Sequence, residues 1–222
     1  TNLEKLGVMI QTPEHVLAAL VGCDLDNVII ELNSSELPIM DGSSKYFVEA
    51  LEKVGSVEQE AERKVYVVKD VISYLDEATG SEITIIPSES YSVTAMVDFG
   101  TKVLGTQNAN MKNISDFKSE ISACRTFSFL HELETLLNNG LIKGGDLNNA
   151  IVYVDKEIST ETMTNLKKAF NKESISVTEN GILDNLTLHF PNEAARHKLL
   201  DIVGDLSLIG TRIQGKVIAN KP

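Results

Sequence analysis

The stretch NEAARHKLLDIVGD, residues 192–205, decides how this chain is organised. Asn192 suits the N-cap of a helix and Glu193 suits its first turn, so the stretch predicts a helix. In that helix His197 and Asp201 lie four residues apart on one face, with Asp205 one turn further along. An imidazole and a carboxylate placed in this way can bind the same ion. Part of a metal site is therefore one interpretation of this stretch.

Two interpretations of this pair remain open. A His and an Asp at helical spacing often form only a solvated ion pair. The same stretch is rich in apolar residues, namely Leu199, Leu200, Ile202, Val203, Leu206 and Leu208. It is therefore expected to be largely buried, where polar groups must be paired or bind a ligand. A zinc site also needs a third donor and an open position for water, and the best candidate for that donor is His15.

The composition limits the class of protein. The chain has 222 residues, 42% of them hydrophobic, which is enough for one large or two small domains. We expect no membrane span and no signal segment, and therefore a cytoplasmic protein. The net charge of −12 argues against nucleic-acid binding, because phosphate contacts need clustered Lys and Arg. Cys23 and Cys124 lack paired spacing and are interpreted as small buried residues.

The first part of the chain predicts a strand followed by a helix. The strand ends at Gln11, Thr12 suits the helix N-cap and Pro13 suits the first helical position. Glu14 and His15 then lie in the first turn, where the helix dipole favours an ionised carboxylate. The elements expected next are a strand at 27–32, a loop at 34–42, a helix at 43–54 and a linker at 55–63.

The remainder predicts strands and helices in alternation. The expected strands are 65–71, 81–87, 90–99, 150–154, 182–190 and 211–220. The expected helices are 115–124, 129–139, 160–171 and 192–205. These elements lack a strict βαβ rhythm, which indicates an α+β fold class.

Four blocks of sequence together resemble one known family. They are TPEH (12–15), ELPIMDGS (36–43), a segment from RTF (125–127) to GG (144–145), and RHKLLDIVGD (196–205). In this order they are similar to signature stretches of the zinc-dependent UDP-3-O-acyl-N-acetylglucosamine deacetylases of lipid A biosynthesis. The likeness runs over nearly the whole chain.

The resemblance implies a two-domain α/β sandwich with the active site between the domains. Residues 1–60 would be the remainder of an N-terminal domain, incomplete in this chain, and 61–222 the C-terminal domain, with an insert near 128–185. Members of the family have a further N-terminal portion before the TPEH block. They also have a Gly-His pair, whose histidine is the general acid, just after a strand that corresponds to 216–222. Segment 156–185 looks longer than in many members. Some similar members are fused to a 3-hydroxyacyl-carrier-protein dehydratase.

The resemblance also implies roles for individual residues. The metal ligands would be His15, His197 and Asp201, holding Zn²⁺, with Fe²⁺ as the alternative. The catalytic residues would be Glu14 as general base, Thr126 as a hydroxyl near the reacting carbonyl and Asp205 as the partner of a catalytic histidine. The substrate-binding residues would be Lys198 for the anionic part, and Phe127, Leu133, Ile142, Gly145 and Ala150 for the acyl chain. Without the resemblance, Thr126 is interpreted as a strand threonine with backbone hydrogen bonds, and Lys198 as a charge on the helix surface.

The implied reaction is hydrolysis of the acetamide of UDP-3-O-(3-hydroxyacyl)-N-acetylglucosamine, which releases acetate in the committed step of lipid A biosynthesis. Zinc would make hydroxide available near neutral pH, and Glu14 would accept the proton. Two alternatives stay open. The chain could bind zinc and the sugar nucleotide but turn over weakly, because the general-acid histidine lies beyond Pro222. It could also be a structural module in which His197 and Asp201 pair only with each other.

Overall fold

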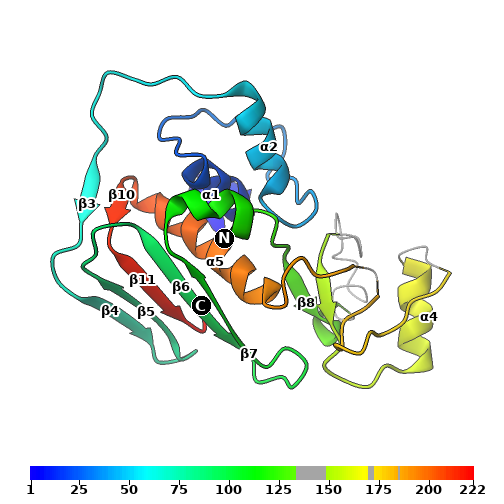
Figure 1. Ribbon diagram of the computed structural model, residues 1–222. Coiled ribbons are helices and arrows are strands. Elements are labelled where there is room, and N and C mark those ends of the chain that lie inside the picture. Colours follow the sequence, from blue (N-terminus) through cyan, green and yellow to red (C-terminus); the bar gives the residue numbers. More distant parts are fainter. Residues whose placement is uncertain (134–148, 170–172, 185) are drawn as a thin grey trace.

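A five-stranded mixed sheet forms the largest layer of the computed structural model, which describes residues 1–133, 149–169, 173–184 and 186–222 (Figure 1). The strand order is β4-β5-β11-β6-β7. The central strand β11 is antiparallel to β5 and parallel to β6. The bounds are β4 (Ile72–Asp76), β5 (Ser81–Ile86), β6 (Ser92–Asp98), β7 (Thr106–Met111) and β11 (Lys216–Asn220).

One face of this sheet is covered by helices. Val93, Ala95 and Val97 alternate along β6 and are all fully buried, as the two-residue period of a strand requires. They pack with the apolar side of α5 (Glu193–Leu206), including Leu199 and Leu200. Figure 1 shows α5 lying across the sheet, with α1 (Glu14–Gly22) beside it and α2 (Lys45–Val54) further out.

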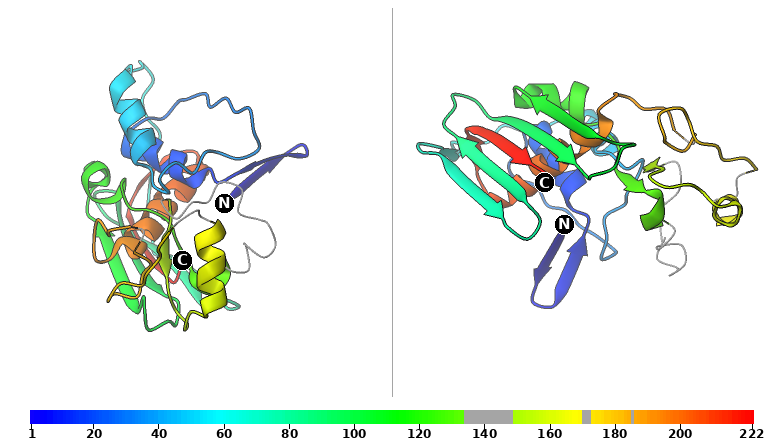
Figure 2. Two further views of the ribbon diagram at one scale, coloured as in Figure 1. Left: turned by 90° about the vertical axis from the view of Figure 1, so that its right-hand side faces the viewer. Right: turned by 90° about the horizontal axis from the view of Figure 1, so that it is seen from below.

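Smaller elements surround this core. β1 (Asn2–Lys5) and β2 (Val8–Gln11) form a hairpin that projects from the rest of the chain (Figure 2). Leu6 and Gly7 at its turn have φ values of 53° and 77°, the positive values that a type I′ turn needs. The short helices are η1 (Ile114–Asp116), η2 (Phe117–Ile121) and η3 (Ser207–Ile209). β3 (Val65–Val67) pairs in parallel with β10 (Arg212–Gln214).

A second, smaller core lies beside the main one. β8 (Phe127–Phe129) and β9 (Ile151–Tyr153) pair in parallel and α4 (Thr160–Ala169) lies next to them (Figure 1). The buried members of this core are Leu130, Val152, Leu166, Ile175 and Leu183. Most of its residues fall within 128–185, the segment that the resemblance implied to be an insert.

The structure confirms the α+β class and corrects several predicted elements. α1 begins at Glu14, with Pro13 as N-cap rather than Thr12, whose φ of 57° lies outside the helical range. Residues 27–32 are not a strand, because their backbone pairs with no strand among the described residues. The predicted strand at 182–190 is reduced to isolated bridges at Ile182 and Leu183. Strands β4 and β7 were not predicted, and most of the helix expected at 129–139 lies outside the described residues.

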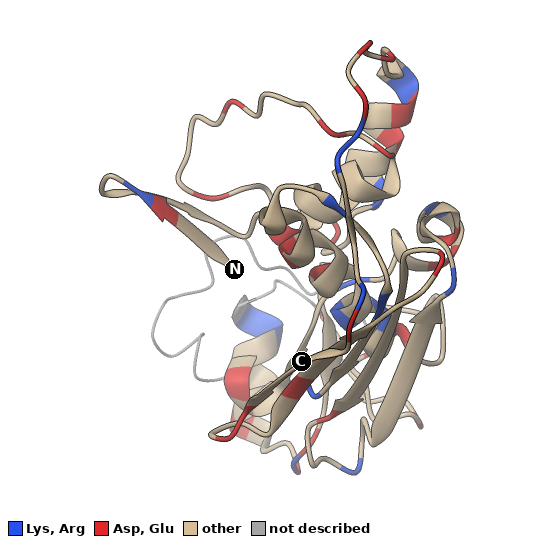
Figure 3. Cartoon of the chain, turned by 90° about the vertical axis from the view of Figure 1, so that its left-hand side faces the viewer, with Lys and Arg blue, Asp and Glu red and all other residues tan. Residues whose placement is uncertain are grey.

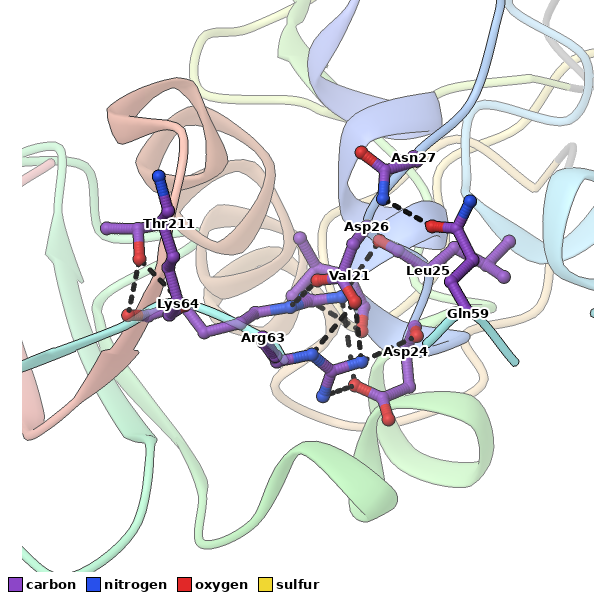
Figure 4. Close-up of polar contacts among 10 residues, drawn as sticks. Val21, Asp24, Leu25, Asp26, Asn27, Gln59, Arg63, Lys64 and Thr211 are labelled. Atoms are coloured by element: carbon purple, nitrogen blue, oxygen red, sulfur yellow. Dashed lines mark hydrogen bonds and ion pairs between the residues drawn. The ribbon is translucent and has the colours of Figure 1, made fainter. Parts of the chain in front are cut away.

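An ion-pair cluster attaches the end of α1 to the rest of the chain (Figure 4). Arg212 donates from Nη2 to the Leu25 carbonyl (2.8 Å) and from Nε to Asp26 (3.1 Å). Arg63 donates to Asp26 (2.8 Å) and to Asp24 (2.7 Å). The positive charges therefore lie just beyond the C-terminal end of α1, where the helix dipole favours a cation.

Charges of both signs are spread over the surface. On the side of the described chain that Figure 3 shows, basic and acidic segments are interleaved rather than gathered by sign. Within the described residues, no helix combines the length and the apolar character that crossing a bilayer would require.

We expect Arg212→Ala to lower the free energy of unfolding by about 1 to 3 kcal/mol, because its charged hydrogen bonds to the α1 end are partly buried. Arg63→Ala is the matched control, since its side chain is 37% exposed against 19% for Arg212. It should cost less than about 1 kcal/mol. Urea unfolding measures both. Equal losses, or the larger loss for Arg63→Ala, would contradict this assignment.

Candidate metal centre

Two histidines and one aspartate from different helices meet in the interior. His15 lies in the first turn of α1, and His197 and Asp201 lie one turn apart on α5. Oδ1 of Asp201 is 3.8 Å from Nε2 of His15 and 3.5 Å from Nε2 of His197. The two imidazole rings have centroids 5.0 Å apart, and the three possible ligand atoms lie within 4.8 Å of one another. The structure thus brings together the three predicted metal ligands.

One hydrogen bond orients His197, whereas two buried polar atoms of the other two residues have no hydrogen-bond partner. Nδ1 of His197 lies 3.0 Å from the carbonyl oxygen of Cys124, to which it can donate, so that Nε2 keeps a free lone pair on the side of Asp201. Oδ1 of Asp201 and Nδ1 of His15 are buried without a hydrogen-bond partner. A buried carboxylate oxygen without a partner is costly unless a cation binds it. Two imidazole nitrogens and one carboxylate oxygen form a donor set that suits zinc.

Burial and neighbouring charges set the protonation states of the cluster. Burial, together with the neighbouring His197, lowers the pKa of His15 to about 4. Burial opposes ionisation of Asp201, but His197 and Lys198 outweigh it, and the pKa of Asp201 is lowered. Near neutral pH His15 is therefore uncharged and Asp201 ionised, as metal ligation requires. Burial also raises the pKa of the Cys124 thiol to about 12, so this nearby sulfur stays protonated.

A glycine on α5 allows the two helices to approach at the centre. A Cβ atom on Gly204 would lie 2.2 Å from the backbone oxygen of Glu14 and 3.2 Å from the backbone nitrogen of Ala18. Neither atom belongs to a flexible side chain, so only glycine allows this contact. The backbone that carries Glu14 and His15 therefore packs directly on α5.

A cavity of about 220 Å³ is lined by one of the three possible ligands, Asp201. Its lining residues are Thr1, Glu14, Lys198, Asp201, Ile202, Asp205 and Pro222. Oε2 of Glu14 faces the amino group of Thr1 at 3.2 Å without hydrogen-bond geometry. Burial raises the pKa of Asp205, which accepts a hydrogen bond from the Thr1 hydroxyl (2.7 Å). Glu14, from the block 12–15, and Lys198 and Asp205, from the block 196–205, thus line one space together with Asp201.

Phe127 lies close to Lys198, one of the residues that line this cavity. Nζ of Lys198 lies 3.1 Å from Oδ2 of Asp201 and 5.8 Å from the centre of the Phe127 ring. The backbone of Thr126 donates to the carbonyl of Gly42 (2.7 Å). The 36–43 block and the 125–127 block, far apart in the sequence, are therefore in direct contact.

The other residues predicted to contact the acyl chain lie in or near the second core or outside the described residues. Leu133 is half-buried against the second core, and Ala150 is half-buried directly before β9. Ile142 and Gly145 lie outside the described residues. Phe127 is part of an aromatic cluster with Phe99, Phe129 and Tyr153.

Sequence reasoning missed two buried charges next to the site. Arg125 and Glu193 form an ion pair of 2.9 Å, and their side chains are 7% and 0% exposed. From the sequence, Glu193 is identified only as an acid in the first turn of a helix. Its position four residues before His197 was the available signal, because such spacing places both on one helix face.

Comparison with known proteins agrees with this geometry. The family model described as "LpxC: UDP-3-O-acyl N-acetylglycosamine deacetylase" matches residues 1–170 and 162–222. Fold and site together define an α+β protein with a buried cluster of two histidines and one aspartate that could hold a metal ion. The chain belongs to the LpxC family. The family predicted from the four sequence blocks is thereby confirmed, and the two matches overlap within the segment 156–185 that looked longer than usual.

Individual relatives cover the chain completely. A protein of Bacteroides thetaiotaomicron named "Bifunctional enzyme LpxC/FabZ" is 42% identical over 222 residues, which are 100% of this chain and 48% of the relative. A protein of Syntrophotalea carbinolica named "UDP-3-O-acyl-N-acetylglucosamine deacetylase" is 36% identical over 222 residues, again 100% of this chain and 63% of the relative. The chain thus spans about half of the first relative and less than two thirds of the second.

We expect Gly204→Ala to weaken zinc binding about tenfold or more, because the new methyl group must displace the backbone beside His15. Gly22→Ala is the matched control, since its Cβ would lie 2.1 Å from the Phe117 ring at the opposite end of α1. Both changes should destabilise the fold by about 1 to 3 kcal/mol through overpacking. Competition with a chromophoric chelator measures zinc affinity. A similar loss of affinity in both variants would contradict the specific role of Gly204.

Proposed function

We propose that this chain carries the site of a zinc-dependent amide hydrolase, which removes the acetyl group of UDP-3-O-(3-hydroxyacyl)-N-acetylglucosamine and releases acetate. The observation that carries the proposal is the meeting of His15, His197 and Asp201 beside a cavity that Glu14 also lines. The substrate class comes from the names of the family and of its deacetylase relatives. In these terms the reaction opens lipid A biosynthesis.

His15, His197 and Asp201 would hold the metal. When bound there, Zn²⁺, or Fe²⁺ in its place, supplies Lewis-acid polarisation of the acetamide carbonyl and lowers the pKa of a bound water. The chain contributes two imidazoles, of which that of His15 is uncharged near neutral pH, and one carboxylate in a largely buried setting. Buried electrostatic interactions are screened less than exposed ones, which favours charge stabilisation at this point.

Glu14 is the proposed general base. Its carboxylate precedes a metal ligand in the chain and lines the same cavity as Asp201. A carboxylate in this position can accept the proton of the attacking water at a carboxylate oxygen.

Three further residues would act on the substrate or on its charge. The hydroxyl of Thr126 would donate a hydrogen bond to the carbonyl oxygen as negative charge develops there. Lys198 would contact the anionic part of the substrate. Asp205 would orient a catalytic histidine and so support protonation of the leaving amine.

The acyl chain would lie along the aromatic and aliphatic side chains of the second core. Phe127, with the cation of Lys198 over its ring, would mark the point where this apolar path meets the polar site. The remaining residues assigned to the path are Leu133, Ile142, Gly145 and Ala150. A division into an N-terminal part, 1–60, and a C-terminal part, 61–222, with the active site between two domains, belongs to the same proposal.

Removing one ligand should abolish stoichiometric metal binding. We expect His15→Ala to reduce the zinc content from about one equivalent to a small fraction, because two protein ligands do not form a stable zinc site. His131→Ala is the control, since His131 pairs with Asp155 outside the centre (2.7 Å) and should leave the content unchanged. Atomic absorption after dialysis measures both. About one equivalent remaining in His15→Ala would refute the three-ligand assignment.

Glu14→Gln should separate metal binding from hydrolysis. We expect retained zinc and a roughly 10²- to 10⁴-fold lower rate of acetate release, because glutamine cannot accept the proton. Glu49→Gln is the control, since Glu49 is an exposed acid of α2 paired with Lys45. Acetate release from the acylated UDP-sugar measures both. An unchanged rate in Glu14→Gln would remove this residue from the mechanism.

A further inference from the structure

We propose that the buried Glu193 is a positioning residue for the metal ligand His197, and that it acts through the peptide group between Cys124 and Arg125. This role rests on the proposed zinc site. Glu193 and Arg125 would then support a metal ligand from outside the site, and neither residue was predicted to be a ligand or a catalytic group.

Glu193 is completely enclosed and fully hydrogen-bonded. Its Oε1 accepts from the backbone N–H of Arg125 (3.0 Å) and from Nε of the same residue (2.9 Å). Its Oε2 accepts from Nη2 of Arg125 (3.2 Å) and from the backbone N–H of His189 (2.7 Å). Nη2 of Arg125 also donates to the carbonyl of Thr187 (2.6 Å). Four donors around one carboxylate define its position closely.

One planar peptide group connects Glu193 to the metal ligand. The N–H that Glu193 holds and the carbonyl of Cys124 belong to the same peptide unit, whose atoms lie in one plane. That carbonyl lies 3.0 Å from Nδ1 of His197. Fixing the N–H end therefore fixes the direction of the carbonyl end. The order of contacts is carboxylate, peptide N–H, peptide carbonyl, imidazole Nδ1–H.

The arrangement determines which nitrogen of His197 faces the centre. With Nδ1–H donating to Cys124, the free lone pair is on Nε2, which lies 3.5 Å from Oδ1 of Asp201. A ligating histidine that donates its other N–H to an outer group is held in one tautomer and one orientation. Hydrogen bonds in series also polarise one another, so the charge of Glu193 strengthens the carbonyl as an acceptor.

The position of Glu193 on α5 favours this role over a purely stabilising one. Glu193, His197 and Asp201 follow one another at intervals of four residues and so share one face of the helix. A buried ion pair contributes little net stability compared with apolar residues of similar volume. The pair of Arg125 and Glu193 does, however, hold the segment that contains both the Cys124 carbonyl and Thr126.

The test measures zinc affinity and the histidine tautomer in the full chain. In Glu193→Gln the new amide N–H₂ group cannot accept hydrogen bonds from the N–H groups around it. Some of the four hydrogen bonds to the Glu193 carboxylate are therefore lost. We expect zinc affinity to fall about 10- to 100-fold, as for other outer-shell partners of metal ligands. In the zinc-free protein, ¹⁵N NMR should show His197 with its proton on Nδ1 in the wild type and a mixture of tautomers in the variant.

Two further variants complete the design. Asp155→Asn is the control, because Asp155 has a 6% exposed side chain and pairs with a histidine outside the centre, and its zinc affinity should equal that of the wild type. If Glu193→Gln does not fold, Arg125→Lys provides the test. Lysine keeps the positive charge but cannot donate from both Nε and Nη2 to the Glu193 carboxylate. We expect the zinc affinity of this variant to fall as well. Wild-type affinity and an unchanged His197 tautomer in the folded variant would overturn the inference. Absence of zinc binding by the wild type would instead refute the proposed function.

Discussion

The direct contact between α1 and α5 is the constraint on which the site depends. Gly204 has no side chain, so the backbone at Glu14 and Ala18 can rest against α5. This contact places His15, from the start of the chain, opposite His197 near its end. The five-stranded sheet supports α5 from its other side through a continuous apolar core. A metal centre built on two packed helices is held more rigidly than one built on loops.

The same contact buries polar groups at a cost to stability. Two imidazoles and a carboxylate lie together in the interior, and Oδ1 of Asp201 has no hydrogen-bond donor. Burying such groups without partners is unfavourable, whereas a bound cation pairs them. Metal binding at this point would therefore stabilise the folded chain by linkage. The lowered pKa of His15 also favours metal binding, because an uncharged imidazole has a lone pair for the metal.

Local signals in the sequence predicted part of the fold and part of the candidate site. Capping and periodicity identified α5 and α1 to within one or two residues, because these signals act within a few residues of the chain. The run at 27–32 was misread, because its β-branched residues suit a strand but no described strand pairs with it. β4 and β7 were missed, because both are edge strands that depend on pairing with β5 and β6. The pair of Arg125 and Glu193 joins residues 68 positions apart, and tertiary packing alone specifies such contacts.

The proposed function requires that His15, His197 and Asp201 together bind one divalent cation. X-ray absorption spectroscopy of the zinc-loaded chain at the zinc edge tests it most directly. The account predicts only nitrogen and oxygen neighbours at about 2.0 to 2.2 Å, with the scattering pattern of two imidazole rings and no sulfur. A sulfur neighbour at about 2.3 Å, or the signal of a single imidazole, would contradict it.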